Sequence, residues 1–382
     1  MVWGIDKYIQ IAPCFRDEDP RADRHMCEFY QIDCEMSFVN QEDVYAVVEW
    51  YINELIPTLS PHKKITVAFK RLKHREAIDL YGSDKPDLRF GMPLVEMTQD
   101  FVASWFSVFK DTVANKWTIK AMKFENKILS RKEADELTEH VKKNKAKWLA
   151  YISFDAEGVK WSIAKFLSPE EVETIKLKTW AKEWDTILFV ADIYEVVTTS
   201  LGRLRTFIRD KYLTIDKDDL SFCRIEDFPL FEMTDEGKLD FCHNPFSIVK
   251  WWAEALKNPD KLAIYSEQYD LACNGYEILS GSIRNHDPEL LLEAFKMVGR
   301  GEEEIKQKFG AMYEAFQFGP PPHGWFAIGF DRLLMILKDE DNIREIYAFP
   351  KSGRAQDVMM GAPSFVDQNQ LDELGIKIVE KK

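Results

Sequence analysis

The sequence predicts an α+β fold in which an antiparallel β-sheet is flanked by helices and carries a smaller inserted α+β domain. Apolar and polar residues alternate strictly over residues 28–38, which indicates a half-buried strand, whereas the apolar residues of 41–56 recur at helical spacing. The Asn274-Gly275 dipeptide between two apolar runs predicts a tight β-hairpin. Residues 97–188 differ from the rest in their sequence pattern, which predicts short strands and helices rich in Lys and Glu. We interpret them as the inserted domain.

The composition is that of a folded protein with room for two or three domains of about 150 residues each. Hydrophobic residues make up 46% of the 382 positions and charged residues 30%, and only 17 Gly and 16 Pro are present, which excludes collagen-like and low-complexity classes. No stretch approaches the ~20 apolar residues of a membrane span, and the N-terminus has neither a basic leader nor an apolar core. We therefore expect a cytoplasmic protein.

The net charge and the cysteine spacing argue against further classes of protein. The net charge of −14 would repel a polyanion over much of the surface, so a nucleic-acid partner would need a local basic patch. None of the six cysteines belongs to a Cys-x-x-Cys pair, which argues against a zinc ribbon and a disulfide framework. We expect reduced core thiols at Cys14, Cys27, Cys34, Cys223, Cys242 and Cys273.

The opening elements are a strand at residues 8–15, a charged loop at 16–25, the alternating strand and the helix of 41–56, which Pro57 is expected to end. The first strand follows Met1 so closely that we expect a further segment upstream. We expect a first part of the main domain at 1–96, the inserted domain at 97–188 and a second part at 189–382. Later elements are predicted as a helix at 131–147, a helix at 194–212, strands within 222–283, helices at 288–299 and about 302–316, a strand at 325–329 and a helix at 331–337.

Polar residues of the first two strands can share one face. Period-two alternation sends Arg16 and Glu18 to the same side, and it also groups Phe29, Gln31 and Asp33. If the two sides coincide, they combine a guanidinium that suits a phosphate with a ring that suits a nucleobase. The alternative is an ordinary solvated strand face.

The Asn274-Gly275 hairpin sets a register in which Ala272 faces Glu277. Asp270 then lies on the same face, diagonally opposite Glu277, with backbones roughly 7–8 Å apart. Two carboxylates so placed can share Mg²⁺. Two exposed acids on a hairpin remain the alternative.

Two further arginines stand out. Strict alternation along the strand would send the side chains of Glu277 and Arg284 to opposite faces, and a bulge at Ser280-Gly281 would bring both to one face. The Arg284 guanidinium would then suit a substrate carboxylate. A structural salt bridge is the alternative. Arg332 falls in the first turn of a helix, where a cation is unfavourable unless it reaches an anion. Without a Walker loop or Gly-x-Gly-x-x-Gly, these groups suggest ATP bound on an antiparallel sheet.

Several blocks carry a resemblance to a known family. Residues 14–19, 21–24, 28–38, 81–91 and 329–333 resemble bacterial-type aspartyl-tRNA synthetase, and the similarity runs from about Val2 to Glu380, with 97–188 similar to that family's insertion domain. The resemblance implies a class II synthetase catalytic domain on a six- or seven-stranded antiparallel sheet. It also implies a fragment, since the family's OB-fold and motif 1 do not precede Met1.

The resemblance also implies roles for individual residues. Arg16 would hold the α-phosphate and Arg332 the γ-phosphate, as the two catalytic residues, and Phe29 would stack on adenine. Asp270 and Glu277 would hold Mg²⁺. The full set implied at ATP is Arg16, Asp17, Glu18, His25, Phe29, Glu277, Gly329, Phe330, Asp331 and Arg332, and the set implied at aspartate is Asp33, His243 and Arg284.

The implied reaction is activation of L-aspartate by ATP and transfer to tRNA(Asp), with tRNA(Asn) as an additional acceptor left open, in a homodimeric full-length protein. Two alternatives also stay open: a truncated paralogue that binds nucleotide or a partner without catalysis, and an AMP-forming amide ligase that makes asparagine. Departures from the family pattern are expected to crowd or re-polarise the pocket, at Asn244, Leu279, Ser280 and Trp325.

Overall fold

The computed structural model describes residues 1–18, 21–23, 25–156, 158–160 and 163–379. Asp19, Pro20 and Arg24 of the charged loop, and Glu380 at the end of the family resemblance, lie outside the described residues. Contacts divide the chain into two compact units. The large unit comprises Met1–Tyr8 and Glu35–Phe326, and the small unit comprises Ile9–Cys34 and Ala327–Lys382.

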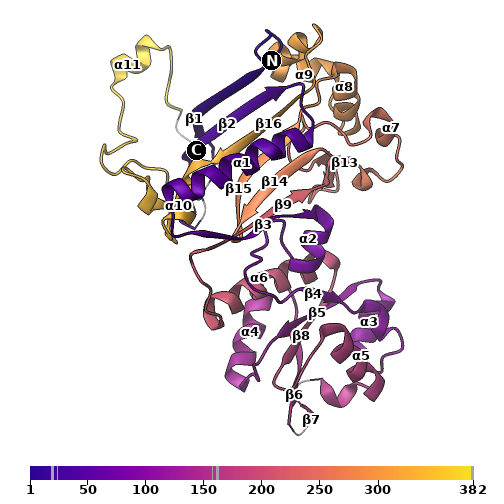
Figure 1. The fold of residues 1–382 in the computed structure, drawn as a ribbon. Coiled ribbons are helices and arrows are strands. Elements are labelled where there is room, and N and C mark those ends of the chain that lie inside the picture. Colours follow the sequence, from indigo (N-terminus) through magenta and orange to yellow (C-terminus); the bar gives the residue numbers. More distant parts are fainter. Residues whose placement is uncertain (19–20, 24, 157, 161–162, 380–382) are drawn as a thin grey trace. The chain divides into compact units, whose positions relative to one another are not determined.

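Within the described residues, seven strands form the main sheet in the order β1-β2-β16-β15-β14-β9-β3 (Figure 1). β14 is antiparallel to both β15 and β9, but β3 is parallel to β9. The α+β class with a large antiparallel sheet is therefore confirmed, and β3, at the end of the strand order, adds a parallel neighbour to β9. A parallel neighbour is possible there because a long crossover, residues 74–218, separates the two strands. The strands are β1 Lys7–Phe15, β2 Glu28–Ser37, β3 Lys64–Lys73, β9 Asp219–Glu226, β14 Gln268–Cys273, β15 Tyr276–Ile283 and β16 His323–Gly329.

The hairpin of β14 and β15 has the predicted two-residue turn. Asn274 and Gly275 both have positive φ, 53° and 92°, as a type I′ turn requires. Cys273 pairs with Tyr276 and Ala272 with Glu277, so the predicted register is confirmed at the turn.

The predicted bulge exists, but its position was wrong. Leu271 pairs with Leu279 while Ala272 pairs with Glu277, so Ile278 has no partner on β14 and is the extra residue. Gly281 has another role: a Cβ there would lie 2.4 Å from the Trp325 carbonyl oxygen and 2.4 Å from the Tyr269 ring. Gly281 therefore permits close packing, whereas the bulge lies nearer the turn.

Helix α1, Gln41–Leu59, begins at Asn40, whose side chain accepts hydrogen bonds from the backbone amides of Glu42 and Asp43. The prediction that Pro57 ends the helix was wrong, because Pro57 lies inside it. The Ser60 amide still donates to the Ile56 carbonyl at 2.8 Å, so proline in the last turn leaves the final bonds intact. The buried face of α1 packs on the sheet through residues such as Tyr45, whose ring meets that of Tyr269 edge to face.

A second sheet in the described part has the order β4-β5-β8-β6-β7. Apolar clusters cover it, one of them including α4 and α6 (Figure 1). The expected domain limits at 97 and 188 stay a prediction. Its elements and neighbours are β4 Leu94–Glu96, η1 Thr98–Phe101, α3 Ser107–Ala114, β5 Thr118–Phe124, α4 Arg131–Lys143, β6 Ala150–Asp155, β7 Gly158–Lys160, η2 Ala164–Phe166, α5 Pro169–Thr179, β8 Thr186–Asp192 and α6 Tyr194–Tyr212.

Helix α2, His74–Tyr81, meets α6 through two glycines. Gly82 ends α2 with φ of 64°, and a Cβ there would lie 2.2 Å from the Thr198 carbonyl oxygen. A Cβ on Gly202 would lie 2.5 Å from the Gly82 carbonyl oxygen. Only glycine at both positions permits this approach, and the contact fixes where the chain leaves α2.

The helix of residues 194–212 is confirmed at the predicted limits, whereas the helices predicted at 131–147 and 288–299 end earlier, at Lys143 and Met297. All six cysteines are free, but only Cys223 and Cys273 are buried, so four of the expected core thiols are half-buried. Among the described residues, no helix is long and apolar enough to cross a membrane. The remaining elements are β10 Phe228–Pro229, β11 Phe231–Met233, β12 Leu239–Phe241, α7 Trp252–Leu256, η3 Lys261–Ala263, β13 Tyr265–Ser266, α8 Pro288–Met297, α9 Glu302–Phe316, α10 Phe330–Leu337, η4 Ile343–Ile346 and α11 Gln368–Glu373.

Candidate active site

The predicted site residues belong to both units, and each unit is described by itself. The small unit contains Arg16, Asp17, Glu18, His25, Phe29, Asp33, Gly329, Phe330, Asp331 and Arg332; the large unit contains His243, Asp270, Glu277 and Arg284.

Arg16 and Phe29 share one face of the first two strands, as predicted. The guanidinium carbon of Arg16 lies 5.0 Å from the centre of the Phe29 ring. The Arg16 amide donates to the Cys27 carbonyl at 2.8 Å, which keeps the strand ends in register. Arg16 is exposed and Phe29 half-buried, so the ring orients a guanidinium that solvent can reach.

The loop between these strands holds the predicted His25 and Glu18 close to each other. His25 Nε2 lies 3.9 Å from a carboxylate oxygen of Glu18, an ion pair only when the imidazole is protonated. Backbone hydrogen bonds between Arg21 and His25, 2.8 and 3.0 Å long, close a tight turn. Asp17, the residue before Glu18 in the sequence, is exposed. The described part of the loop therefore carries a half-buried imidazole at His25 and exposed carboxylates at Asp17 and Glu18.

Asp33 lies on β2, four residues after Phe29. Its carboxylate accepts a hydrogen bond of 3.1 Å from the Gln10 amide group. The Cys14 thiol donates to the Gln31 side-chain oxygen at 3.3 Å. Polar side chains of the two strands therefore contact each other in two pairs on this face, Gln10 with Asp33 and Cys14 with Gln31.

Asp331 is buried and joins β2 to the start of α10. One of its carboxylate oxygens accepts a 3.0 Å hydrogen bond from the Tyr30 amide and a 2.6 Å bond from the Tyr347 hydroxyl. Burial, reinforced by the Asp331 carboxylate, raises the pKa of Tyr347, so the phenol stays a donor. Sequence reasoning missed Tyr347, which follows no motif.

The other predicted site residues of this segment are the sequence neighbours of Asp331. Gly329 is the residue from which α10 starts, Phe330 is exposed and Arg332 half-buried in the first helical turn. The Asp331 contacts therefore fix the backbone from which Arg332 projects.

In the large unit, Asp270 is 6% exposed, and its Oδ1 has no hydrogen-bond partner among the described residues. Burial and the neighbouring Glu277 carboxylate raise its pKa well above the ordinary value. A buried, unpaired carboxylate oxygen beside a second carboxylate is costly by itself. A hard cation would satisfy both groups, so these residues fit Mg²⁺.

Lys85 is a residue of this cluster that sequence reasoning missed. Its ammonium nitrogen lies 3.1 Å from a carboxylate oxygen of Asp84 and 3.6 Å from one of Glu277. Burial lowers the pKa of Lys85, but Asp84 and Glu277 outweigh that effect, and the net pKa lies above the ordinary value. The ammonium is therefore a fixed positive charge.

Arg284 lies on the same face as Glu277, because the bulge at Ile278 changes the parity of the strand between them. An Arg284 nitrogen donates to a Glu35 carboxylate oxygen at 2.9 Å, and the guanidinium lies 4.3 Å from the Trp325 ring centre. The salt bridge is thus present, and the carboxylate clamp stays a prediction. His243 is exposed, with its ring edge-on to Phe228 at 5.1 Å.

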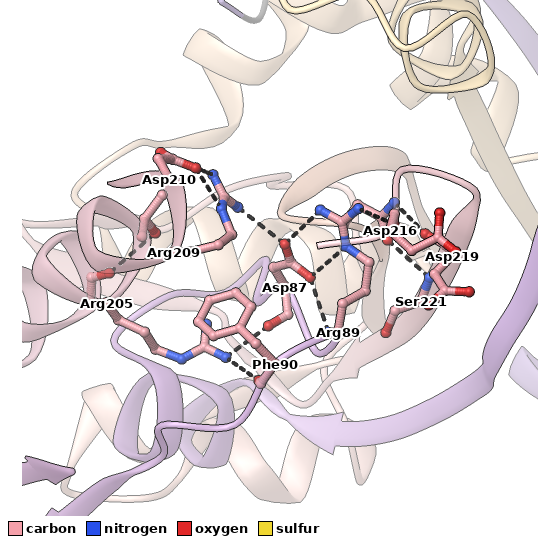
Figure 2. A network of polar contacts seen from close by, with 12 residues as sticks. Asp87, Arg89, Phe90, Arg205, Arg209, Asp210, Asp216, Asp219 and Ser221 are labelled. Atoms are coloured by element: carbon pink, nitrogen blue, oxygen red, sulfur yellow. Dashed lines mark hydrogen bonds and ion pairs between the residues drawn. The ribbon is translucent and has the colours of Figure 1, made fainter. Parts of the chain in front are cut away.

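A network around Asp87 follows Lys85 in the chain (Figure 2). The Asp87 carboxylate accepts hydrogen bonds from the amide and guanidinium of Arg89, 2.8–3.0 Å long, and from Arg209 at 3.1 Å. Arg205 donates to the Asp87 and Phe90 carbonyls at 2.8 and 3.0 Å, and burial lowers the pKa of Arg205 to about 10. Because Arg205 and Arg209 belong to α6, the network ties this segment to that helix.

Comparison with known proteins places this chain in a family. The family model described as tRNA synthetases class II (D, K and N) matches residues 1–353. The chain is 44% identical over 380 residues to Aspartate--tRNA(Asp/Asn) ligase of Chlorobium chlorochromatii (strain CaD3), covering 99% of this chain and 63% of that protein. It is 45% identical over 381 residues to the ligase of the same name from Pelodictyon phaeoclathratiforme (strain DSM 5477 / BU-1), with the same shares of 99% and 63%.

A similar relative comes from Wolbachia pipientis subsp. Culex pipiens (strain wPip), also named Aspartate--tRNA(Asp/Asn) ligase, with 44% identity over 384 residues, 100% of this chain and 64% of that protein. The chain thus spans a little under two thirds of the length of these relatives. Because the family model matches most of the chain, this protein belongs to the class II tRNA synthetases (D, K and N).

Proposed function

We propose that this chain is the catalytic region of an aspartate–tRNA ligase, which activates L-aspartate with ATP and transfers it to tRNA. The observation that carries the proposal is 44% identity, over 99% of the chain, to a relative named for that activity. The exposed Arg16, and Asp270 and Glu277 on one face of the β14–β15 hairpin, would supply the groups that the chemistry needs.

In the first step an oxygen of the aspartate α-carboxylate attacks the α-phosphorus of ATP. The bond from that phosphorus to the bridging oxygen breaks, and pyrophosphate leaves with the electron pair. No side chain forms a covalent bond, so the protein's task is to position the substrates and neutralise charge. Arg16 would hold the α-phosphate, Arg332 the γ-phosphate and Phe29 the adenine.

Mg²⁺ held by Asp270 and Glu277 would neutralise negative charge on the phosphate oxygens. The Asp270 oxygen that lacks a hydrogen-bond partner among the described residues supports this assignment. The remaining residues implied at ATP, namely Asp17, Glu18, His25, Gly329, Phe330 and Asp331, would position the nucleotide around the two arginines.

Aspartate would be recognised by Arg284, with His243 and Asp33 as further contacts. Arg284 already pairs with Glu35, so a side-chain carboxylate would join or replace that partner. An amide in place of the carboxylate would leave the guanidinium poorly matched. In the second step a hydroxyl of the terminal tRNA ribose attacks the adenylate carbonyl and AMP leaves. The tRNA would be tRNA(Asp), or both tRNA(Asp) and tRNA(Asn), and the complete protein a homodimer.

ATP–pyrophosphate exchange tests the proposal. The folded chain should exchange label only with L-aspartate present, and Arg16→Ala should lower the rate at least ~100-fold, because it removes a charge at the reacting phosphate. Arg21→Ala is a matched control, because Arg21 belongs to the same loop and pairs with Asp23.

Other outcomes would identify the alternatives. Tight ATP binding without any exchange would indicate a non-catalytic paralogue, and ammonia-dependent formation of asparagine without tRNA charging would indicate an amide ligase.

A further inference from the structure

The lysine beside the proposed cation site has no role in the function described so far. We propose that Lys85 is a built-in counter-ion of the Asp270–Glu277 site, which keeps its affinity for a free divalent cation low so that the cation enters with a nucleotide. This inference deepens the proposed function and rests on it for the nucleotide.

The position of the Lys85 ammonium makes it a competitor of a cation for the Glu277 carboxylate. Its ammonium is 3.6 Å from a carboxylate oxygen of Glu277, within the range of an ion pair. A further carboxylate, that of Asp84, lies 3.1 Å away. The Lys85 side chain is 32% exposed, so solvent screens its charge only in part. A divalent cation on Glu277 would meet a positive charge already in place.

Asp270 provides the independent sign that the cluster is built for a ligand. It is 6% exposed, and its Oδ1 has no hydrogen-bond partner in the described part of the chain. An acidic cluster that only decorates a surface would be solvated. Here one oxygen is buried and unpaired on the face of the hairpin that also carries Glu277.

Lys85 is held in place from both sides along the chain. Before it, Gly82 is locked against Gly202 of α6 by an approach that leaves no room for a Cβ. After it, Asp87 is held by Arg89 and by Arg209 of α6 (Figure 2). Only two residues separate Lys85 from Gly82, and one separates it from Asp87. The backbone of Lys85 is therefore anchored, which limits how far its ammonium can withdraw from Glu277.

When two cations share one carboxylate, each binds more weakly, because the other reduces the negative charge that attracts it. A bare cation would have to bind against the Lys85 charge. A cation bound to a triphosphate brings negative oxygens that give Lys85 a new partner, so the same charge then favours binding. Removing the Lys85 charge should therefore help the free cation and hinder the nucleotide complex.

Titration of the folded chain with Mn²⁺ alone, followed by the EPR signal of free Mn²⁺, tests this inference. Lys85→Met should bind Mn²⁺ about tenfold more tightly than the unmodified chain, because a nearby positive charge is gone. Lys85→Arg keeps the charge and should stay within about twofold. Lys250→Met is the matched control: it removes a lysine from an ion pair with Asp227, elsewhere in the large unit, and should not change Mn²⁺ binding.

Adding Glu277→Gln to Lys85→Met should abolish the gain. The inference is overturned if folded Lys85→Met binds Mn²⁺ no more tightly than the unmodified chain, if neither chain binds Mn²⁺, or if the gain survives Glu277→Gln. Lys85→Gln gives the same readout should the methionine variant fail to fold. Loss of aspartate-dependent exchange in the unmodified chain would refute the proposed function, whereas the Mn²⁺ titration reports on Lys85 separately.

Discussion

Replacing Asp87 with alanine should destabilise the large unit by about 3 kcal/mol, because it leaves two arginines without their buried partner. The Asp87 side chain is 2% exposed, and its carboxylate accepts hydrogen bonds from Arg89 and Arg209. Removing one partner of a buried ion pair typically costs ~3–5 kcal/mol. Arg89 and Arg209 are 13% and 19% exposed, and Arg209 keeps its contact with Asp210, so we expect the lower end.

Urea unfolding, followed by tryptophan fluorescence, measures this loss as the change in midpoint at constant slope. Asp210→Ala is the control, because Asp210 also pairs with Arg209 but its side chain is 60% exposed. An exposed pair contributes at most ~1 kcal/mol. A loss below ~1 kcal/mol for Asp87→Ala, or one equal to that of the control, would refute the role assigned to the network.

Three further outcomes are expected. Gly82→Ala should lower the free energy of unfolding by ~2 kcal/mol or more in urea titrations, since it adds strain at positive φ and a clash with α6, whereas Gly91→Ala, with no atom within 4 Å of its Cβ, should change it little; equal losses would contradict the packing argument. Arg284→Ala should raise the KM for aspartate at least ~10-fold more than the KM for ATP in exchange assays, and equal increases would remove it from the aspartate pocket. The pKa of Glu133 is lowered to about 2, chiefly by its hydrogen bond to Lys127, so NMR titration should find it there. Because the folded pKa lies below the unfolded one, the stability advantage over Glu133→Gln should be present above pH ~4.5 and disappear as the pH falls toward 2.

Local signals predicted the elements that depend on neighbours in sequence. Asn274-Gly275 predicts the register of its hairpin because both residues accept the positive φ that a two-residue turn needs. The helix of 194–212 is predicted at its observed limits because its apolar period is continuous. The shared face of Arg16 and Phe29 follows in the same way from the period of two.

Features that depend on distant partners could not be predicted. The contact of Lys85 with Glu277 joins two segments that no local pattern relates, and the same holds for Asp87 with Arg209 and for Asp331 with Tyr347. Pro57 remained inside its helix because the bonds after it could still form, which depends on the geometry of the last turn. In each of these places the structure depends on tertiary contacts or local geometry that residue propensities do not specify.

The extra residue at Ile278 determines which side chains of β15 share a face with Glu277. If Ile278 paired as an ordinary strand residue, alternation would be unbroken, and Ser280, Ser282 and Arg284 would lie on the opposite side of the sheet from Glu277. Deleting Ile278 would instead leave these three residues at even spacing from Glu277, so a regular strand would keep all four side chains on one side. Homologous chains and engineered versions should therefore tolerate the loss of this residue better than the loss of a paired residue between Ser280 and Arg284, which would move Arg284 to the other side.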